Sequence, residues 1–116
     1  LGNNGGVVVL CQPWQDIDED CKKILDNYGH EQHAGEFETS VMLHIDSTKV
    51  GNDLIDCVPE VQATYFDYQY MKYYCPDGVW GKATLASSEK GQLLFDAMVE
   101  VTAKKLSNTF DQLEND

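Results

Sequence analysis

The residues most able to do chemistry lie in one segment, residues 29–40. It holds two histidines, three glutamates and two glycines within twelve residues, in the order Gly-His-Glu-Gln-His-Ala-Gly-Glu-Phe-Glu-Thr-Ser. Imidazole and carboxylate groups bind divalent metals and transfer protons near neutral pH. The segment therefore indicates a metal site or an acid–base site, and such a site needs further groups from elsewhere.

The spacing of the two histidines argues against a zinc protease. The H-E-x-x-H motif places its histidines at i and i+4 on one face of a helix. Here His30 and His33 are at i and i+3, and Gly29 and Gly35 flank them. We therefore set this class aside and expect His30, like its neighbour Glu31, to be solvated.

A helix predicted over 34–45 would position the remaining groups. If it begins near His33, Glu36 lies at i+3 and shares the face of that histidine. Glu38 then points the other way, more nearly inward, where a carboxylate needs a metal, a cation or N–H donors. The alternative is that Glu36 and Glu38 only compensate the helix dipole in the first turn. The same helix is expected to bury Phe37, Val41 and Ile45.

Apolar spacing predicts two more helices. One spans 16–27, and the other follows a cap at Ser87 or Ser88, with Glu89 in its first turn. We expect the acidic tail, 109–116, to be frayed. The positions expected to be buried are Ile17, Cys21, Ile24 and Leu25 in the first helix, and Leu94, Ala97, Met98 and Val101 in the last.

The chain has few signals for strands. The apolar run Val7–Leu10 predicts a strand buried on both faces of a parallel sheet. Residues 46–77 have no clear period, hold five of the six tyrosines, and are expected to form short strands and long loops. Because a parallel strand needs neighbours, residues 1–116 are interpreted as one α/β domain, or part of one, that lacks strands.

Charge and composition exclude several partners. The net charge is −12, with only 8 Lys and Arg residues, so binding to nucleic acid or to an anionic membrane is not expected. No apolar run is long enough to span a membrane. The four cysteines form no C-x-x-C pair, and without a visible secretion signal we expect reduced thiols and a cytoplasmic location.

Two blocks of the sequence resemble one enzyme family. Residues 33–43, H-A-G-E-F-E-T-S-V-M-L, are similar to the H-A-G-E-x-E-T-S-x-M-L segment of the creatininase (creatinine amidohydrolase) family. Residues 78–91, G-V-W-G-K-A-T-L-A-S-S-E-K-G, resemble its G-V-x-G-D-P-T-x-A-S-x-E-K-G stretch. The run Val7–Leu10 followed by Trp14 is similar to the strand and tryptophan that precede the histidine. Lys82 and Ala83 depart from the usual D-P.

The resemblance implies a three-layer α/β/α fold with a mainly parallel sheet. It implies hydrolysis of a cyclic or small amide, such as creatinine or a formamide, by water activated on zinc, manganese or iron. His33 would be the catalytic histidine, and Glu36 or Glu38 would bind the metal. Trp14 would cover the substrate, and Gly35 would let backbone or substrate approach closely. The resemblance also implies a homo-oligomer such as a hexamer.

The family's other metal ligands are not present in the chain. They lie in an E-x-H pair, a later aspartate and an N-G-H-G-G-N loop, which this sequence lacks. We therefore expect the C-terminal half of such an enzyme, inactive alone, with the remaining ligands supplied by an N-terminal half or a partner subunit. The alternative is a non-catalytic remnant or assembly subunit that uses the aromatic region from Tyr65 to Tyr74 as a contact surface.

Overall fold

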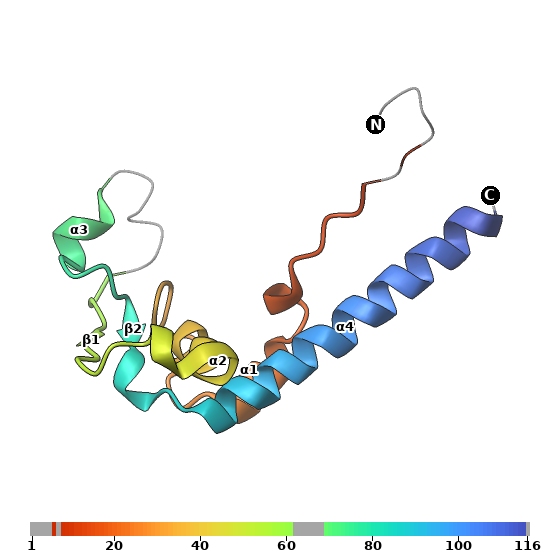
Figure 1. Cartoon of the computed structure of the whole chain (residues 1–116). Helices are drawn as coiled ribbons and strands as arrows, with labels where there is room; N and C mark the ends of the chain where they lie inside the picture. Colours follow the sequence, from red (N-terminus) through yellow and green to blue (C-terminus); the bar gives the residue numbers. More distant parts are fainter. Residues whose placement is uncertain (1–5, 7, 62–68, 116) are drawn as a thin grey trace.

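The computed structural model describes residues 6, 8–61 and 69–115 (Figure 1). Three α-helices form the body of the molecule, and a small two-stranded sheet lies at one end. In chain order the elements are η1 (Pro13–Gln15), α1 (Asp18–Ile24), α2 (Glu36–Asp46), η2 (Ser47–Lys49), β1 (Asp56–Cys57), α3 (Met71–Tyr74), β2 (Gly81–Lys82), η4 (Ala83–Leu85) and α4 (Ser88–Asn115).

The core lies where α1, α2 and α4 meet. α2 packs chiefly on the N-terminal half of α4, and α1 covers the same region (Figure 1). The apolar positions predicted for α1 and α4 are confirmed as the centre of this core or as partly buried residues against it. In α2, Phe37 and Val41 pack there as predicted. Ile45 is exposed, so the buried face of α2 is shorter than its sequence pattern indicated.

α4 begins where the sequence predicted. The Ser87 hydroxyl accepts a hydrogen bond from the backbone N–H of Lys90 at 3.1 Å, which caps the first turn. The described part of the expected tail, residues 109–115, belongs to α4, which continues to Asn115. Within this last part the Thr109 hydroxyl and the Asn115 amide donate to carbonyls one turn earlier, at 2.8 and 2.6 Å. These bonds follow the helix and support its continuation.

The crossing of α2 and α4 is close enough to require a glycine. A Cβ atom built on Gly91 would lie 1.9 Å from the carbonyl oxygen of Ser40. The Ser40 hydroxyl in turn accepts a hydrogen bond from the backbone N–H of Ser87 at 3.2 Å. Backbone therefore meets backbone at this crossing, and the start of α4 is fixed on the middle of α2.

The predicted strand at Val7–Leu10 is wrong for the residues that the structure describes. Residues 8–10 are not in a strand, and the side chains of Val8 and Leu10 are 82% and 77% exposed. The sheet present in the described part pairs β1 and β2 antiparallel, with Cys57 opposite Gly81. A β-branched run can pair only where a neighbouring strand exists, and no strand of the described residues lies against residues 8–10.

The architecture is more open than that of a compact domain. The radius of gyration is 17.4 Å, whereas a compact domain of 100 residues has about 13 Å. The C-terminal part of α4 and residues 8–12 extend away from the body (Figure 1). The described residues thus form helices and one two-stranded sheet, and not the three-layer arrangement that was expected. Among these residues no helix is both long and apolar enough to cross a membrane.

Replacing Gly91 with alanine should separate α2 from α4. The added methyl group cannot remain 1.9 Å from the Ser40 carbonyl, so we expect Gly91→Ala to destabilise the fold by about 2–3 kcal/mol, despite the better helix propensity of alanine. Urea denaturation would measure the change. Gly51→Ala is the control, because nothing lies within 4 Å of a Cβ there. Equal stability of the two variants would contradict the close crossing.

Candidate functional site

An open cleft of about 470 Å³ lies between α1, the turn after it and the start of α2. Trp14, His33, Gly35 and Glu38 all line it. Trp14 comes from η1 and the other three from residues 33–38, and each was predicted from the sequence as a site residue. Glu36, the fifth predicted residue, is not among the residues of the cleft wall.

His33 and Glu38 are neighbours at the edge of this cleft. Nδ1 of His33 lies 3.8 Å from Oε2 of Glu38, and the two side chains are 59% and 58% exposed. The Glu38 carboxylate also accepts a hydrogen bond from the backbone N–H of Ala34, a residue in the left-handed region with φ of 51°. Glu38 therefore fixes the turn behind His33 while both side chains remain open to solvent and to a ligand.

The orientation of the two glutamates is the reverse of the prediction. α2 begins at Glu36, so His33 precedes the helix and does not share a helical face with Glu36. Glu36 points inward and is 0% exposed, whereas Glu38 faces the cleft. The physical reason is that Glu36 shares the buried face of α2 with Phe37, Ser40 and Val41, one turn apart, whereas Glu38 lies on another face of the helix.

Glu36 is held by hydrogen-bond donors on both oxygens. Oε1 accepts from the backbone N–H of Asp26 at 3.0 Å and from Nζ of Lys90 at 2.6 Å. Oε2 accepts from the backbone N–H of Asn27 at 2.7 Å. These N–H groups are available because α1 ends at Ile24, earlier than predicted, and the chain is extended at Leu25. The buried charge is thus neutralised by a cation and two peptide groups.

Lys90 completes this buried pair. Its ammonium donates to Glu36, to Asp26 at 2.7 Å and to the carbonyl of Leu85 at 2.8 Å, which uses its three donors. Burial is the largest influence on the pKa of Lys90 and lowers it, but the bonds to Asp26 and Glu36 together raise the pKa above its ordinary value. Lys90 therefore stays protonated and joins the start of α4 to the start of α2.

Glu31 has a role that the sequence analysis missed. Its carboxylate accepts from the backbone N–H of Glu36 at 2.6 Å and of Phe37 at 3.0 Å, and so caps α2. Burial has the largest effect on the pKa of Glu31 and raises it, although these two bonds act in the opposite direction. The expectation that Glu31 is solvated is wrong. One signal in the sequence could have indicated this role. Glu31 lies five residues before the start of α2, and the N-cap residue Gly35 has no side chain to cap the helix.

Backbone contacts from residues 78–91, the second of the two family-like blocks, position the first block, residues 33–43. The backbones of His33 and Trp80 form a bridge, in which Trp80 N–H donates to the His33 carbonyl at 2.8 Å and His33 N–H donates back at 3.2 Å. Gly35 meets Gly81, since a Cβ on Gly81 would lie 2.8 Å from the Gly35 Cα. The backbones of Gly35 and Gly81 therefore touch, and a side chain on either residue would prevent this contact. The group that approaches Gly35 closely is thus the backbone of Gly81.

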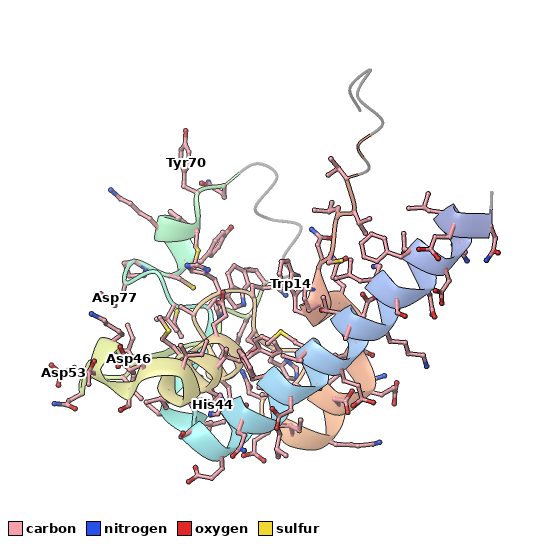
Figure 2. The ribbon with its side chains drawn as sticks, turned by 45° about the vertical axis from the view of Figure 1, so that its right-hand side comes forward. Trp14, His44, Asp46, Asp53, Tyr70 and Asp77 are labelled. Carbon is pink, nitrogen blue, oxygen red and sulfur yellow. The ribbon has the colours of Figure 1, made fainter. Side chains whose placement is uncertain are left out.

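Aromatic side chains give the cleft its apolar wall. Trp14 lies on η1 at the base of the N-terminal segment (Figure 2), and Tyr28 and Phe37 line the same cleft. Trp14 is 54% exposed, so its ring is accessible. The arrangement offers a flat, apolar surface beside an imidazole and a carboxylate, which suits a small planar polar molecule.

The described residues do not form a complete metal site. They contain no group of three or more His, Cys, Asp or Glu side chains arranged to hold a metal ion. His33 and Glu38 offer two donors of suitable chemistry, but stable sites for zinc use at least three protein ligands. The cleft therefore fits a metal only if further ligands are added to these two.

Glu36 is buried and Glu38 is exposed, so removal of the charge should affect stability differently at the two positions. Glu36→Gln removes the charge opposite Lys90, and breaking a buried pair in this way should cost about 3 kcal/mol of unfolding free energy. Glu38→Gln alters an exposed carboxylate and should cost about 0.5 kcal/mol or less. Urea denaturation of both variants tests this. A cost for Glu38→Gln equal to that of Glu36→Gln would contradict the assignment of the buried role.

Comparison with known proteins agrees with the two sequence blocks. Residues 4–106 match the family model Creatininase, described as creatinine amidohydrolase. No match was found among curated proteins or among solved structures. The matched region covers most of the chain and includes every element from η1 to the greater part of α4. The chain therefore belongs to the creatininase family.

Proposed function

We propose that this chain carries part of the active site of a metal-dependent hydrolase of cyclic or small amides, of the creatinine or formamide type. The observation that supports this most directly is the presence of His33 and Glu38, 3.8 Å apart, in a cleft shared with Trp14. Membership of a family of hydrolases agrees with it. An amide of this size would fit a cleft of about 470 Å³.

The residues of the cleft receive separate roles in this proposal. His33 handles the proton of the substrate's amide group, because its side chain is open to the cleft and its backbone is fixed by Trp80. Glu38 is the metal ligand, since both oxygens of Glu36 are already occupied by N–H donors. Trp14 covers the substrate. A bound zinc, manganese or iron ion would supply a nucleophilic water near neutral pH.

The remaining ligands come from outside the residues described. Glu38 cannot hold a metal alone, so we propose that an N-terminal half of the same fold, or a partner subunit, adds the other ligands. The open architecture and the exposed side chains of Val8 and Leu10 support association with such a partner. In this proposal the active form is an oligomer such as a hexamer, and the chain alone is inactive.

A second candidate is a non-catalytic assembly subunit. The aromatic region considered for it extends from Tyr65 to Tyr74, of which residues 62–68 lie outside the described part. Within that part Tyr70 is 86% exposed and projects at the end of the molecule opposite the C-terminus of α4 (Figure 2). Tyr73 is also exposed. Exposed tyrosines are common in protein–protein contacts, which favours this candidate.

Coexpression with a candidate N-terminal half separates the two functions. We expect the assembled protein to contain metal and to hydrolyse creatinine or a formamide. Glu38→Gln should lower both the metal content and the rate, whereas His33→Gln should keep the metal and lower the rate about 10²–10⁴-fold. Metal analysis and a hydrolysis assay measure these quantities. Glu100→Gln, an exposed change on α4, serves as the control.

Two results would reject the proposal. Hydrolysis by the purified 116-residue chain with its own bound metal would show that no further ligands are needed. An assembled protein that binds no metal, and whose assembly is lost in Tyr70→Ala, would support the non-catalytic candidate instead.

A further inference from the structure

Two cysteines that are distant in sequence lie in contact. Sγ of Cys57 is 3.3 Å from Sγ of Cys75, although the residues are 18 positions apart. All four cysteines are thiols in the structure, and within its described residues neither Cys11 nor Cys21 makes such a contact. Two sulfur atoms at this distance need only a small movement to reach bonding distance.

The two thiols differ in their access to solvent. Cys57 is half-buried on β1, and its Sγ also lies 3.5 Å from the carbonyl oxygen of Tyr74. Cys75 follows α3 and is 1% exposed. Burial raises the pKa of the Cys75 thiol to about 12, and the hydrogen bond with Cys57 acts in the same direction. Cys57 is therefore the thiol that a reagent meets first.

We infer that Cys57 and Cys75 are a site of reversible disulfide formation that fastens the small sheet to the end of α3. This refines the expectation of reduced thiols, which we keep for Cys11 and Cys21. The inference stands on the sulfur contact and on the elements that carry the two residues, and it does not depend on the proposed catalytic function.

A small disulfide such as oxidised glutathione is a suitable oxidant. The Cys57 thiolate attacks one sulfur of the oxidant, forms a mixed disulfide and releases one glutathione thiolate. The Cys75 thiol then loses its proton and attacks Sγ of Cys57, which releases the second glutathione. Two protein thiols are oxidised by two electrons, and one glutathione disulfide is reduced to two thiols. The low exposure of Cys75 should make the second step the slower one.

The cross-link would also stabilise the segment behind the candidate site. Cys57 pairs with Gly81 in the sheet, and Gly81 contacts Gly35. The carboxylate of Asp56, next to Cys57, accepts from the backbone N–H and the hydroxyl of Thr84 at 3.0 and 2.6 Å. A bond from Cys57 to Cys75 would therefore limit movement of the strand that adjoins the His33–Trp80 bridge.

Thiol mapping of the full chain tests the inference. The chain is equilibrated with oxidised and reduced glutathione, alkylated, digested and examined by mass spectrometry. We expect one linked pair of peptides, containing Cys57 and Cys75, while Cys11 and Cys21 are alkylated. Excess dithiothreitol should reduce the Cys57–Cys75 disulfide and restore both thiols. We also expect the melting temperature to fall by roughly 5–15 °C on reduction, because the cross-link restricts the unfolded chain.

Variants distinguish this cross-link from a general effect of oxidant. Cys75→Ser should abolish the shift in melting temperature, and Cys11→Ser should leave it unchanged. If Cys75→Ser does not fold, the mapping of the unaltered chain still decides. Full alkylation of Cys57 and Cys75 under oxidising glutathione, or a link between Cys57 and another cysteine, would overturn the inference.

Discussion

The buried carboxylate of Glu36 is the constraint on which the rest of the structure depends. A charged group without contact with water is very costly unless cations and N–H donors surround it. Here the carboxylate lies at the start of α2, and its donors come from two other segments: the turn after α1 and Lys90 on α4. Satisfying one carboxylate therefore requires all three helices to meet in a single arrangement. Removing the Lys90 charge would leave Glu36 buried without a cation, and removing the Glu36 charge would leave Lys90 paired with Asp26 alone.

This constraint determines which groups face the cleft. With Glu36 turned inward, residues one position earlier and two positions later, Gly35 and Glu38, face outward toward the cleft. The close contacts of Gly35 with Gly81 and of Ser40 with Gly91 then bring the two sequence blocks together. The backbone bridge between His33 and Trp80 adds a further contact between the two blocks. Residues of the family motifs thus support the architecture as well as the candidate chemistry, and a given motif residue need not touch substrate.

The proposed association gives the open shape and the incomplete site one physical explanation. An apolar run such as Val7–Leu10 can form a strand only beside neighbouring strands, and a metal needs more protein ligands than Glu38 provides. We propose that one neighbour, which carries the family's other ligands, would meet both requirements. The proposed association with an N-terminal half or partner subunit accounts for both. The creatininase family assignment rests on residues 4–106 and does not depend on this proposal.

The sequence by itself determined the family, the three main helices, most of the small core and four of the residues that line the cleft. These depend on local patterns: apolar residues at helical spacing, a serine cap before α4 and two long motifs. The tertiary structure decided which glutamate is buried, because the register of α2 depends on the cap from Glu31 and on the N–H groups freed by the early end of α1. It also decided that residues 8–10 form no strand and that Cys57 contacts Cys75. Such features depend on residues that are distant in sequence, and no local pattern contains them.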